Sequence, residues 1–539
     1  MRSMSAPDHD SSAGVRVDSP APRPPAGSPR LLAVLDMGAS AIRLAIAERA
    51  GNDRPRIIEE ASKGVLLGRD TFSFGAIRSQ TIDAAIAALS GFCQIMKQYG
   101  VDEVHAVATS AVREARNGDM FLDRIQARTG VAFDIINEAE ESRLVFLAVR
   151  DGLKRHAAFR GARTLLAEVG GGSTSLMLLR RGEPSRSGVY ALGSVRLRQQ
   201  LDLRRHSQDI QHALLRRYVA NVIEEIRLEI PLSRITHFIA IGGDVRFAAS
   251  QIVENDESGP DRAISRERFL AFCEEVEKLD EDSIIERFRL PAVEAETLVP
   301  AMVIYRALLS ETAARRVLIS EASLRSGMLL EVTEPAGRVS AEDFAQQVLA
   351  SADALGRRYR LDRDHGHHVA TLAACLFDEL REEHGLGDRE RLLLKVASLL
   401  HDVGIYVSLR AHHKHSQYIL AESQIFGLSA EETAIVSNIA RYHRRGTPQR
   451  SHVPYVALDR RDRIVVNKLA AILRIANALD AEHVQKVRNL HVTRRGSIWV
   501  LQLEGSGDLT MERLAATARA DMFVETFGRQ ILVQPPTVA

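Results

Sequence analysis

TLLAEVGGGSTSLMLL, residues 164–179, contains two apolar runs joined by a glycine-rich turn. Thr164–Val169 and Ser175–Leu179 have the length and apolar character of buried β-strands. Gly170, Gly171 and Gly172 lack a Cβ, so the turn can expose backbone N–H groups and let a phosphate approach closely. The stretch therefore predicts a β-hairpin whose turn is suited to binding an anion.

A second hairpin of the same kind is expected near the start of the chain. Leu31–Leu35 and Ile42–Ile46 are apolar strands, and the segment between them contains Asp36, Gly38 and Ser40. In both hairpins an apolar strand ends at an acidic residue and a glycine-containing turn with a small hydroxyl side chain. This duplication predicts two similar lobes that face each other across a cleft.

Further elements extend both lobes and change character in the second half of the chain. Apolar residues recur at helical spacing in Ala84–Tyr99, Glu140–Arg150 and Leu214–Leu228, while the strand His237–Ile241 ends in Gly242-Gly243. From residue 340 to residue 480 nearly every segment has a helical pattern, and strands are expected again after it. The first half is therefore predicted to be α/β and the second half mainly helical.

These patterns divide the chain into five parts. Residues 1–29 are rich in Pro, Ser, Ala and Gly and are expected to form a disordered tail. Residues 30–156 and 157–335 are expected to be lobes I and II of one α/β unit. Residues 340–485 are expected to be an all-α domain, and residues 486–539 a small α+β module.

The composition argues against several classes of partner. The 539 residues carry a net charge of +1, so no DNA partner is expected and an anionic substrate needs a local basic cluster. The three cysteines, Cys93, Cys273 and Cys375, lie far apart, a pattern typical of a reducing cytoplasm. No segment has the apolar length of a signal peptide or a membrane span. A cytoplasmic protein without a membrane partner is expected.

Five blocks resemble the successive blocks of the exopolyphosphatase/guanosine pentaphosphatase (Ppx/GppA) family, in that family's order and spacing. They are Leu35–Leu44, Val107–Asn117, Ile135–Val149, Leu166–Leu178 and Leu318–Leu330. Three contain ATSAVREARN, EESRL and GGGST, and the last contains SEASLRSGML. The resemblance extends over roughly the whole ordered chain. It implies a two-lobed ASKHA (sugar kinase/actin/Hsp70-type) fold followed by the helical domain.

The resemblance also implies an activity and a set of site residues. The expected reaction is release of terminal phosphate from inorganic polyphosphate, with guanosine pentaphosphate as the alternative substrate. Glu141, the second glutamate of EESRL, is expected to deprotonate the attacking water, and Arg113 to face the phosphates. Mg²⁺ is expected in the cleft beside Glu168, and the chain is expected to form a homodimer. The residues expected to bind phosphate are Asp36, Gly38, Ser40, Gly171, Gly172, Ser173, Thr174, Gly242 and Gly243.

Four positions depart from the family pattern. The first turn has Ala39-Ser40-Ala41 where the family has Ser-Asn-Ser, and Glu168 stands where the family has Asp. Ser175 stands where the family has Glu, and Asp244 follows the glycines of the third strand, where small residues and Thr are commoner. Octahedral Mg²⁺ sites tolerate displaced carboxylates poorly. A divergent substrate, low activity and a silenced site all remain open.

The helical half contains a second candidate site. Its histidines and aspartates have the order and helical setting of an HD-type phosphohydrolase metal site, whose ligands suit Mn²⁺ or Fe²⁺. The predicted ligands are His365, His401, Asp402 and Asp480, with His415 and His443 as additional ligands of a second metal. His412 and His413 are interpreted as ordinary surface or packed helix residues. Many long members of the family it resembles carry an HD-like domain with incomplete ligands, whose implied role is architectural and dimer-forming. This chain retains the full set, which predicts a second activity.

Two alternatives to a polyphosphatase therefore remain. One is a metal-dependent HD phosphohydrolase whose first half only senses a ligand, and the other is a regulatory protein that binds an alarmone or polyphosphate. Ser40, Glu168 and Ser175 favour these alternatives, whereas the matching Arg113 and Glu141 favour hydrolysis in the cleft.

Overall fold

The computed structural model describes residues 30–49, 55–153, 163–203, 207–252, 263–333, 341–423, 425–444, 446–496 and 498–534. The tail predicted for residues 1–29 lies outside these ranges. Within them, none of the helices combines the length and the apolar character that crossing a membrane requires.

The first lobe is built on a five-stranded sheet of order β3-β2-β1-β4-β5. Its strands are β1 (Arg30–Met37), β2 (Ala41–Arg49), β3 (Arg56–Gly64), β4 (Glu103–Ala108) and β5 (Asp134–Ile135). Its helices are α1 (Leu67–Phe74), α2 (Ser79–Tyr99), α3 (Ser110–Arg113), α4 (Gly118–Thr129) and α5 (Glu138–Leu153). β1 pairs antiparallel with β2 and parallel with β4, so the predicted first hairpin is confirmed.

The second lobe repeats this arrangement in a six-stranded sheet of order β10-β11-β9-β6-β7-β8. Its strands are β6 (Arg163–Val169), β7 (Thr174–Arg180), β8 (Glu183–Tyr190), β9 (His237–Ile241), β10 (Ala263–Ser265) and β11 (Arg316–Ser320). Its helices are α6 (Ser194–Gln200), α7 (Gln208–Glu229), η3 (Leu232–Arg234), α8 (Gly243–Ile252), α9 (Arg266–Val276), α10 (Glu281–Phe288) and α11 (Ala292–Ser310). β6 pairs antiparallel with β7 and parallel with β9, which confirms the second hairpin and the duplication.

Two helices form a layer between the sheets. In β1, Leu32 and Val34 join the core that contains α5 and α12 (Leu324–Thr333), whereas the alternate residues join the core under α2 and α4. From the second sheet, Leu166 and Ile239 enter the same inner core. Strands covered on both faces read as nearly continuous apolar runs, which is why the hairpins stood out in the sequence.

α12 corrects one boundary of the predicted lobes. It was expected to close lobe II, but it packs on α5 of the first lobe. A Cβ on Gly327 would overlap the backbone of Leu144, so only glycine allows the two helices to approach this closely. The inner layer therefore belongs to both lobes.

The second half is a helical domain that continues into three strands. Its helices are α13 (Ala341–Arg358), α14 (Arg363–Glu379), α15 (Arg381–His384), α16 (Asp388–Leu400), η4 (Val403–Tyr406), α17 (His412–Ala421), α18 (Ala430–Arg441), α19 (Val453–Val456) and α20 (Arg460–Ala478). They are followed by β12 (Val487–Arg495), β13 (Ile498–Gly505), α21 (Thr510–Ala518), α22 (Asp521–Phe527) and β14 (Gln530–Gln534). Trp499 and Phe523 belong to the same buried core as Leu376 and Leu473. The C-terminal strands therefore share a core with the helices instead of forming a separate module.

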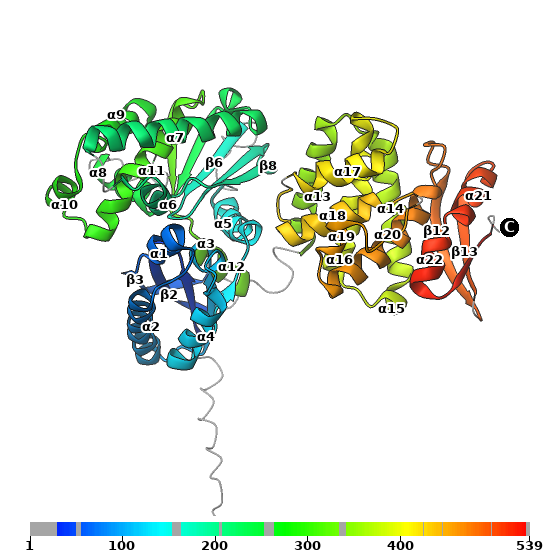
Figure 1. The fold of residues 1–539 in the computed structure, drawn as a ribbon, viewed down its shortest axis with the longest axis horizontal. Helices are drawn as coiled ribbons and strands as arrows, with labels where there is room; N and C mark the ends of the chain where they lie inside the picture. The colour runs from blue at the N-terminus through cyan, green and yellow to red at the C-terminus, as the bar shows by residue number, and fades with distance from the viewer. Residues whose placement is uncertain are drawn as a thin grey trace, which may run out of the picture.

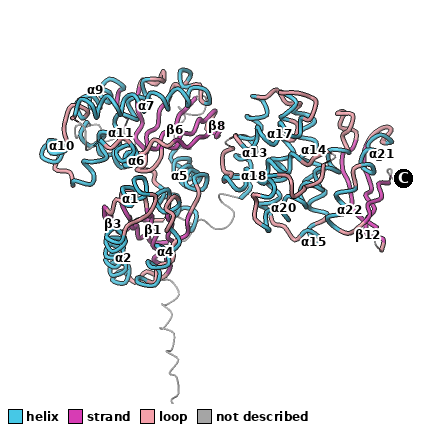
Figure 2. Tube along the Cα trace, in the orientation of Figure 1, coloured by secondary structure: helices cyan, strands magenta, loops and turns pink. Residues whose placement is uncertain are grey.

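Figure 1 shows the two lobes at one side of the molecule, the helical domain beside them and the three C-terminal strands at the far end. Figure 2 shows the same division, with the strands of the lobes and of the C-terminal sheet separated by helices. The helical domain contacts the inner layer through Phe426, whose ring packs edge-on against Phe146 of α5 at 5.9 Å between centroids.

Candidate active site

The turns of the two hairpins meet at the cleft between the lobes. Each turn is closed by a backbone hydrogen bond, from Gly38 N–H to Ala41 at 3.0 Å and from Gly170 N–H to Ser173 at 2.9 Å. A Cβ on Gly171 would lie 3.1 Å from the Cβ of Ala39, so the absence of a side chain lets the two turns touch.

A buried tyrosine aligns the strands that carry the second and third turns. Tyr305 on α11 accepts a hydrogen bond from the N–H of Val169 at 3.2 Å and donates one to the carbonyl of Ile241 at 2.5 Å. These residues end β6 and β9, directly before Gly170 and Gly242. Tyr305 therefore holds two glycine-rich segments side by side, a role that the sequence pattern did not reveal.

The predicted residues largely converge on one cavity of about 140 Å³ between the lobes. Those that line it are Asp36, Gly38, Ser40, Glu141, Glu168, Gly171, Gly172, Ser173, Gly242 and Gly243. Ser175 lines it as well and pairs directly with Glu168 across β6 and β7. The cavity thus combines backbone donors from three turns with three carboxylates.

Burial and neighbouring carboxylates raise the pKa of two acids in the cleft, Glu141 and Glu168. Burial raises the pKa of Glu141 to about 7, an effect that Arg113 opposes and Asp36 increases. Burial raises the pKa of Glu168 to about 8, and the charges of Glu141 and Asp36 add to this shift. Crowded acidic groups of this kind suit a divalent cation, because its charge relieves their repulsion and Mg²⁺ prefers oxygen ligands. The donor set in the cleft therefore fits the Mg²⁺ that the family resemblance implies.

Three arginines that were not predicted also line the cavity: Arg43, Arg246 and Arg325. Arg325 donates to Asp36 at 3.0 Å, and Arg43 lies 3.7 Å from the same carboxylate. Arg43 lies directly opposite Asp36 in the pairing of β1 with β2. The signal available in the sequence was an arginine in the otherwise apolar start of β2. Guanidinium groups at this position provide the local basic cluster that an anionic substrate requires.

Arg113 and Thr174 are placed differently from their predicted roles. Arg113 donates to the carbonyl of Ile136 at 2.6 Å and lies 3.4 Å from Glu138, outside the residues that line the cavity. The charge of Arg113 still affects the cleft, because it opposes the rise in the pKa of Glu141. The hydroxyl of the buried Thr174 donates to the carbonyl of Leu192 at 2.5 Å, so it supports the turn from behind.

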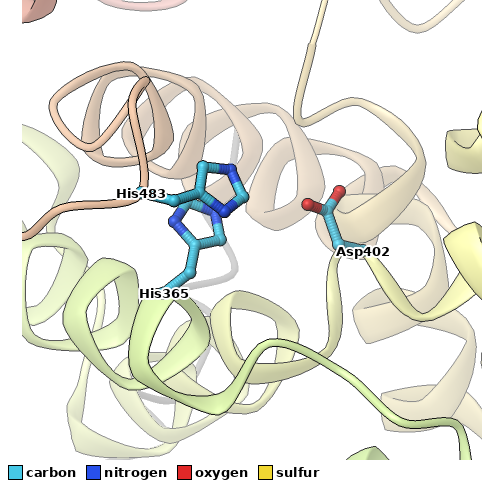
Figure 3. A group of neighbouring side chains, drawn as sticks. All are labelled: His365, Asp402 and His483. Atoms are coloured by element: carbon cyan, nitrogen blue, oxygen red, sulfur yellow. The ribbon is translucent and has the colours of Figure 1, made fainter.

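In the helical domain, histidines and aspartates gather around Asp402. Two groups of side chains among the described residues place their ligand-capable atoms within 4.8 Å of one another. One contains His365, Asp402 and His483, which Figure 3 shows facing one another, and the other contains Asp402, His412 and His443.

The structure brings together some of the residues predicted for this region and not others. His412 was interpreted as an ordinary residue but is buried against Asp402, and His483 was not considered. His415 was expected to be a ligand but belongs to neither group. His415 lies one residue before Ser416, on the part of α17 that packs against Gly404. His365, His401, His443 and Asp480 do lie at the cluster.

Two α/β lobes of matching topology that meet at paired glycine-rich turns define an actin-like, ASKHA-type protein. Residues 45–335 match the Ppx/GppA phosphatase family, and residues 349–517 match Ppx/GppA phosphatase, domain III. The chain belongs to the Ppx/GppA phosphatase family, a family of phosphoanhydride hydrolases. The second match begins within α13 and continues through the helical domain into β12, β13 and α21, in agreement with the core that these elements share. The HD-type assignment of this region stays a prediction.

Individual relatives agree with this family. Exopolyphosphatase 1 of Mycobacterium leprae (strain TN) is 32% identical over 166 residues, which are 31% of this chain and 48% of that protein. Guanosine-5'-triphosphate,3'-diphosphate pyrophosphatase of Vibrio atlanticus (strain LGP32) is 22% identical over 431 residues, 77% of this chain and 81% of the relative. The chain thus spans about half of the first relative and most of the second.

A solved structure supports the fold of the lobes. The crystal structure of an exopolyphosphatase from Cytophaga hutchinsonii superimposes with a TM-score of 0.52 at 22% identity, covering 57% of this chain and 98% of that one. At this level of identity, the likeness shows the fold alone.

Proposed function

We propose that the cleft between the lobes hydrolyses the terminal phosphoanhydride bond of inorganic polyphosphate. The observation that carries this proposal is the convergence of Glu141, three glycine-containing turns and three arginines on one cavity. Neither a structural hairpin nor a solvated helix face requires all of these groups to meet. Phosphoryl transfer depends chiefly on positioning and on electrostatic stabilisation, and these groups supply both.

Each group has a definite part in the proposed reaction. Backbone N–H groups of the turns and the guanidinium of Arg325 hold the terminal phosphate oxygens. Glu141 orients a water and accepts its proton as the water oxygen bonds to phosphorus and the bridging oxygen departs with the shortened chain. Mg²⁺, held by Asp36 and Glu168, would neutralise charge on the phosphates. A carboxylate with a pKa near 7 is well matched to accepting a proton at neutral pH.

The departures from the family pattern compensate each other in this cleft. Glu168 reaches one methylene further than the aspartate of the family, and its cross-strand partner is the small Ser175 instead of a second carboxylate. The shorter partner leaves room for the longer acid, so one carboxylate in the cleft takes the place of two. This arrangement supports a re-adapted site over a silenced one.

Guanosine pentaphosphate is the second candidate substrate. A neighbouring cavity of about 500 Å³ shares Ser40, Arg43 and Gly171 with the cleft. Phe247, Leu290 and Val293 are among its walls. A cavity with both apolar and polar walls next to a phosphate site suits a nucleoside, because the base buries apolar surface and the ribose needs polar partners.

Phosphate release from the full chain tests these alternatives directly. Long-chain polyphosphate and guanosine pentaphosphate are supplied separately with Mg²⁺, and kcat/KM is measured for each. We expect a larger value for polyphosphate. A larger value for guanosine pentaphosphate would select the second candidate. Binding of both ligands without phosphate release would contradict hydrolysis and leave a regulatory binding protein.

A further inference from the structure

Three buried histidines of the helical domain are held in the same tautomer. The Nδ1 atoms of His401, His412 and His443 lie 2.7, 3.1 and 2.6 Å from the backbone carbonyls of residues 398, 409 and 440. A carbonyl oxygen can only accept, so each Nδ1 donates its proton. In a neutral imidazole, Nε2 then carries a lone pair.

All three lone pairs point toward Asp402. The Nε2 atoms of His412 and His443 lie 3.2 and 3.3 Å from Oδ1 of Asp402, and that of His401 lies 3.6 Å from Oδ2. The Nε2 atoms of His412 and His443 are only 3.1 Å apart. Acceptors this close repel one another unless a cation lies between them.

A protonated histidine satisfies only part of this arrangement. One extra proton on His412 would bridge it to Asp402 or His443. The Nε2 of His401 would still be buried without a hydrogen-bond partner, and so would the Nε2 of His365. A neutral Nε2 atom that has no hydrogen-bond partner is in the form that binds a metal ion.

His365 completes a second set on the other side of Asp402. Its Nδ1 lies 2.8 Å from Asp480, which in turn accepts a hydrogen bond from the N–H of Gln485 at 2.8 Å. The ring of His483 stacks on that of His365 at 3.6 Å, and Figure 3 shows Asp402 facing the pair. A carboxylate behind a histidine is the usual way to fix the orientation of a metal-binding ring.

The local fold holds Asp402 rigidly between the two sets. A Cβ on Gly404 would overlap the backbone of α17, so η4 packs directly against that helix. Ser416 accepts from the N–H of Gly404 at 2.9 Å and donates to the carbonyl of His401 at 2.6 Å. These contacts fix the backbone on both sides of Asp402.

From these contacts we infer that the helical domain binds two divalent transition-metal ions that share Asp402 as a bridging ligand. One ion is held with His412 and His443, and the other with His365 and His483, while the free Nε2 of His401 lies beside the shared carboxylate. Asp480 orients His365 from behind. Imidazole and carboxylate ligands together select Mn²⁺, Fe²⁺ or Zn²⁺ over Mg²⁺. This site is separate from the cleft between the lobes and does not depend on the proposed function.

Metal content of the full chain tests this inference. The purified protein is stripped with a chelator, then loaded anaerobically with Mn²⁺, Fe²⁺ or Zn²⁺ in excess Mg²⁺, which occupies the cleft. After desalting, elemental analysis is expected to find two transition-metal ions per chain. His412→Ala and His365→Ala should each retain one ion, and Asp402→Asn should retain none.

His415→Ala is the matched control, because it removes a histidine of the same helix as His412 that lies outside both groups. It should retain two ions. Circular dichroism identifies any variant that does not fold. As a second readout, added metal should raise the melting temperature of the wild type and of His415→Ala but not of Asp402→Asn. Wild type without metal, wild type with one ion, or Asp402→Asn with both ions would each overturn the inference.

Discussion

Replacing Glu141 by glutamine removes a carboxylate while keeping its shape. Glu141 lies on α5 at the cavity wall, where burial raises its pKa to about 7. Removal of a general base costs about 10²–10⁴-fold in kcat. This loss corresponds to about 3–5 kcal/mol of transition-state stabilisation. KM should change little, because the amide occupies the same volume and the turns and arginines still hold the phosphates.

The pH dependence gives the prediction a second readout. The ionised carboxylate is the active form, so wild-type kcat should rise with pH through about 7 and then level off. Bound Mg²⁺ favours ionisation, so the midpoint should move to lower pH as Mg²⁺ increases. Glu141→Gln should lose this rise in kcat, leaving only the pH dependence of its residual activity.

Phosphate release from polyphosphate is the assay, and Glu140→Gln is the control. Glu140 precedes Glu141 on the same helix but does not line the cavity. Its carboxylate pairs with Arg143 at 2.6 Å. This substitution should leave kcat and the pH profile nearly unchanged. The assignment of the base is refuted if Glu141→Gln keeps wild-type turnover, or if both variants lose activity equally.

Three other substitutions probe the surroundings of this base. Glu168→Asp should lower kcat about 10–100-fold and raise the Mg²⁺ concentration needed for saturation, because the shorter side chain displaces the carboxylate by about 1 Å. Unchanged turnover and Mg²⁺ dependence would place Glu168 away from the metal. Arg325→Ala should raise KM for polyphosphate about tenfold or more, because it removes a charged donor and leaves Asp36 without its 3.0 Å partner; an unaltered KM would exclude Arg325 from phosphate binding. Gly327→Ala should lower the free energy of unfolding by about 1–3 kcal/mol, measured by denaturant titration, because its Cβ overlaps the backbone of Leu144; equal stability would mean that α12 and α5 separate easily.

The sequence predicted the hairpins well because both faces of their strands are buried. The continuous apolar runs of β1, β2, β6 and β7 are typical of buried strands, and the glycines between them indicated the turns. The cleft residues followed from the repeated pattern and from the resemblance. Arg43, Arg246 and Arg325 were missed because an isolated arginine has no periodic signal, and only the pairing of strands and the return of α12 bring them together.

The helical domain was harder to predict in detail. His412 and His415 lie three residues apart on one helix, and the sequence alone does not say which of them faces Asp402. Gly404 and Ser416 decide this through the packing of η4 against α17. The join to the C-terminal strands was missed for a similar reason, since a shared core depends on contacts between distant residues such as Leu376 and Trp499.

The inner layer of α5 and α12 has a consequence for motion between the lobes. The two sheets belong to different lobes and meet through these helices, so a rotation that opens the cleft has its axis near them. Glu141 and Arg325 are on the two helices and would move little, whereas the turns at Ala39 and Gly171 would separate. We therefore expect substrate entry and product exit to be controlled by the touching turns, while the catalytic base stays fixed near the hinge.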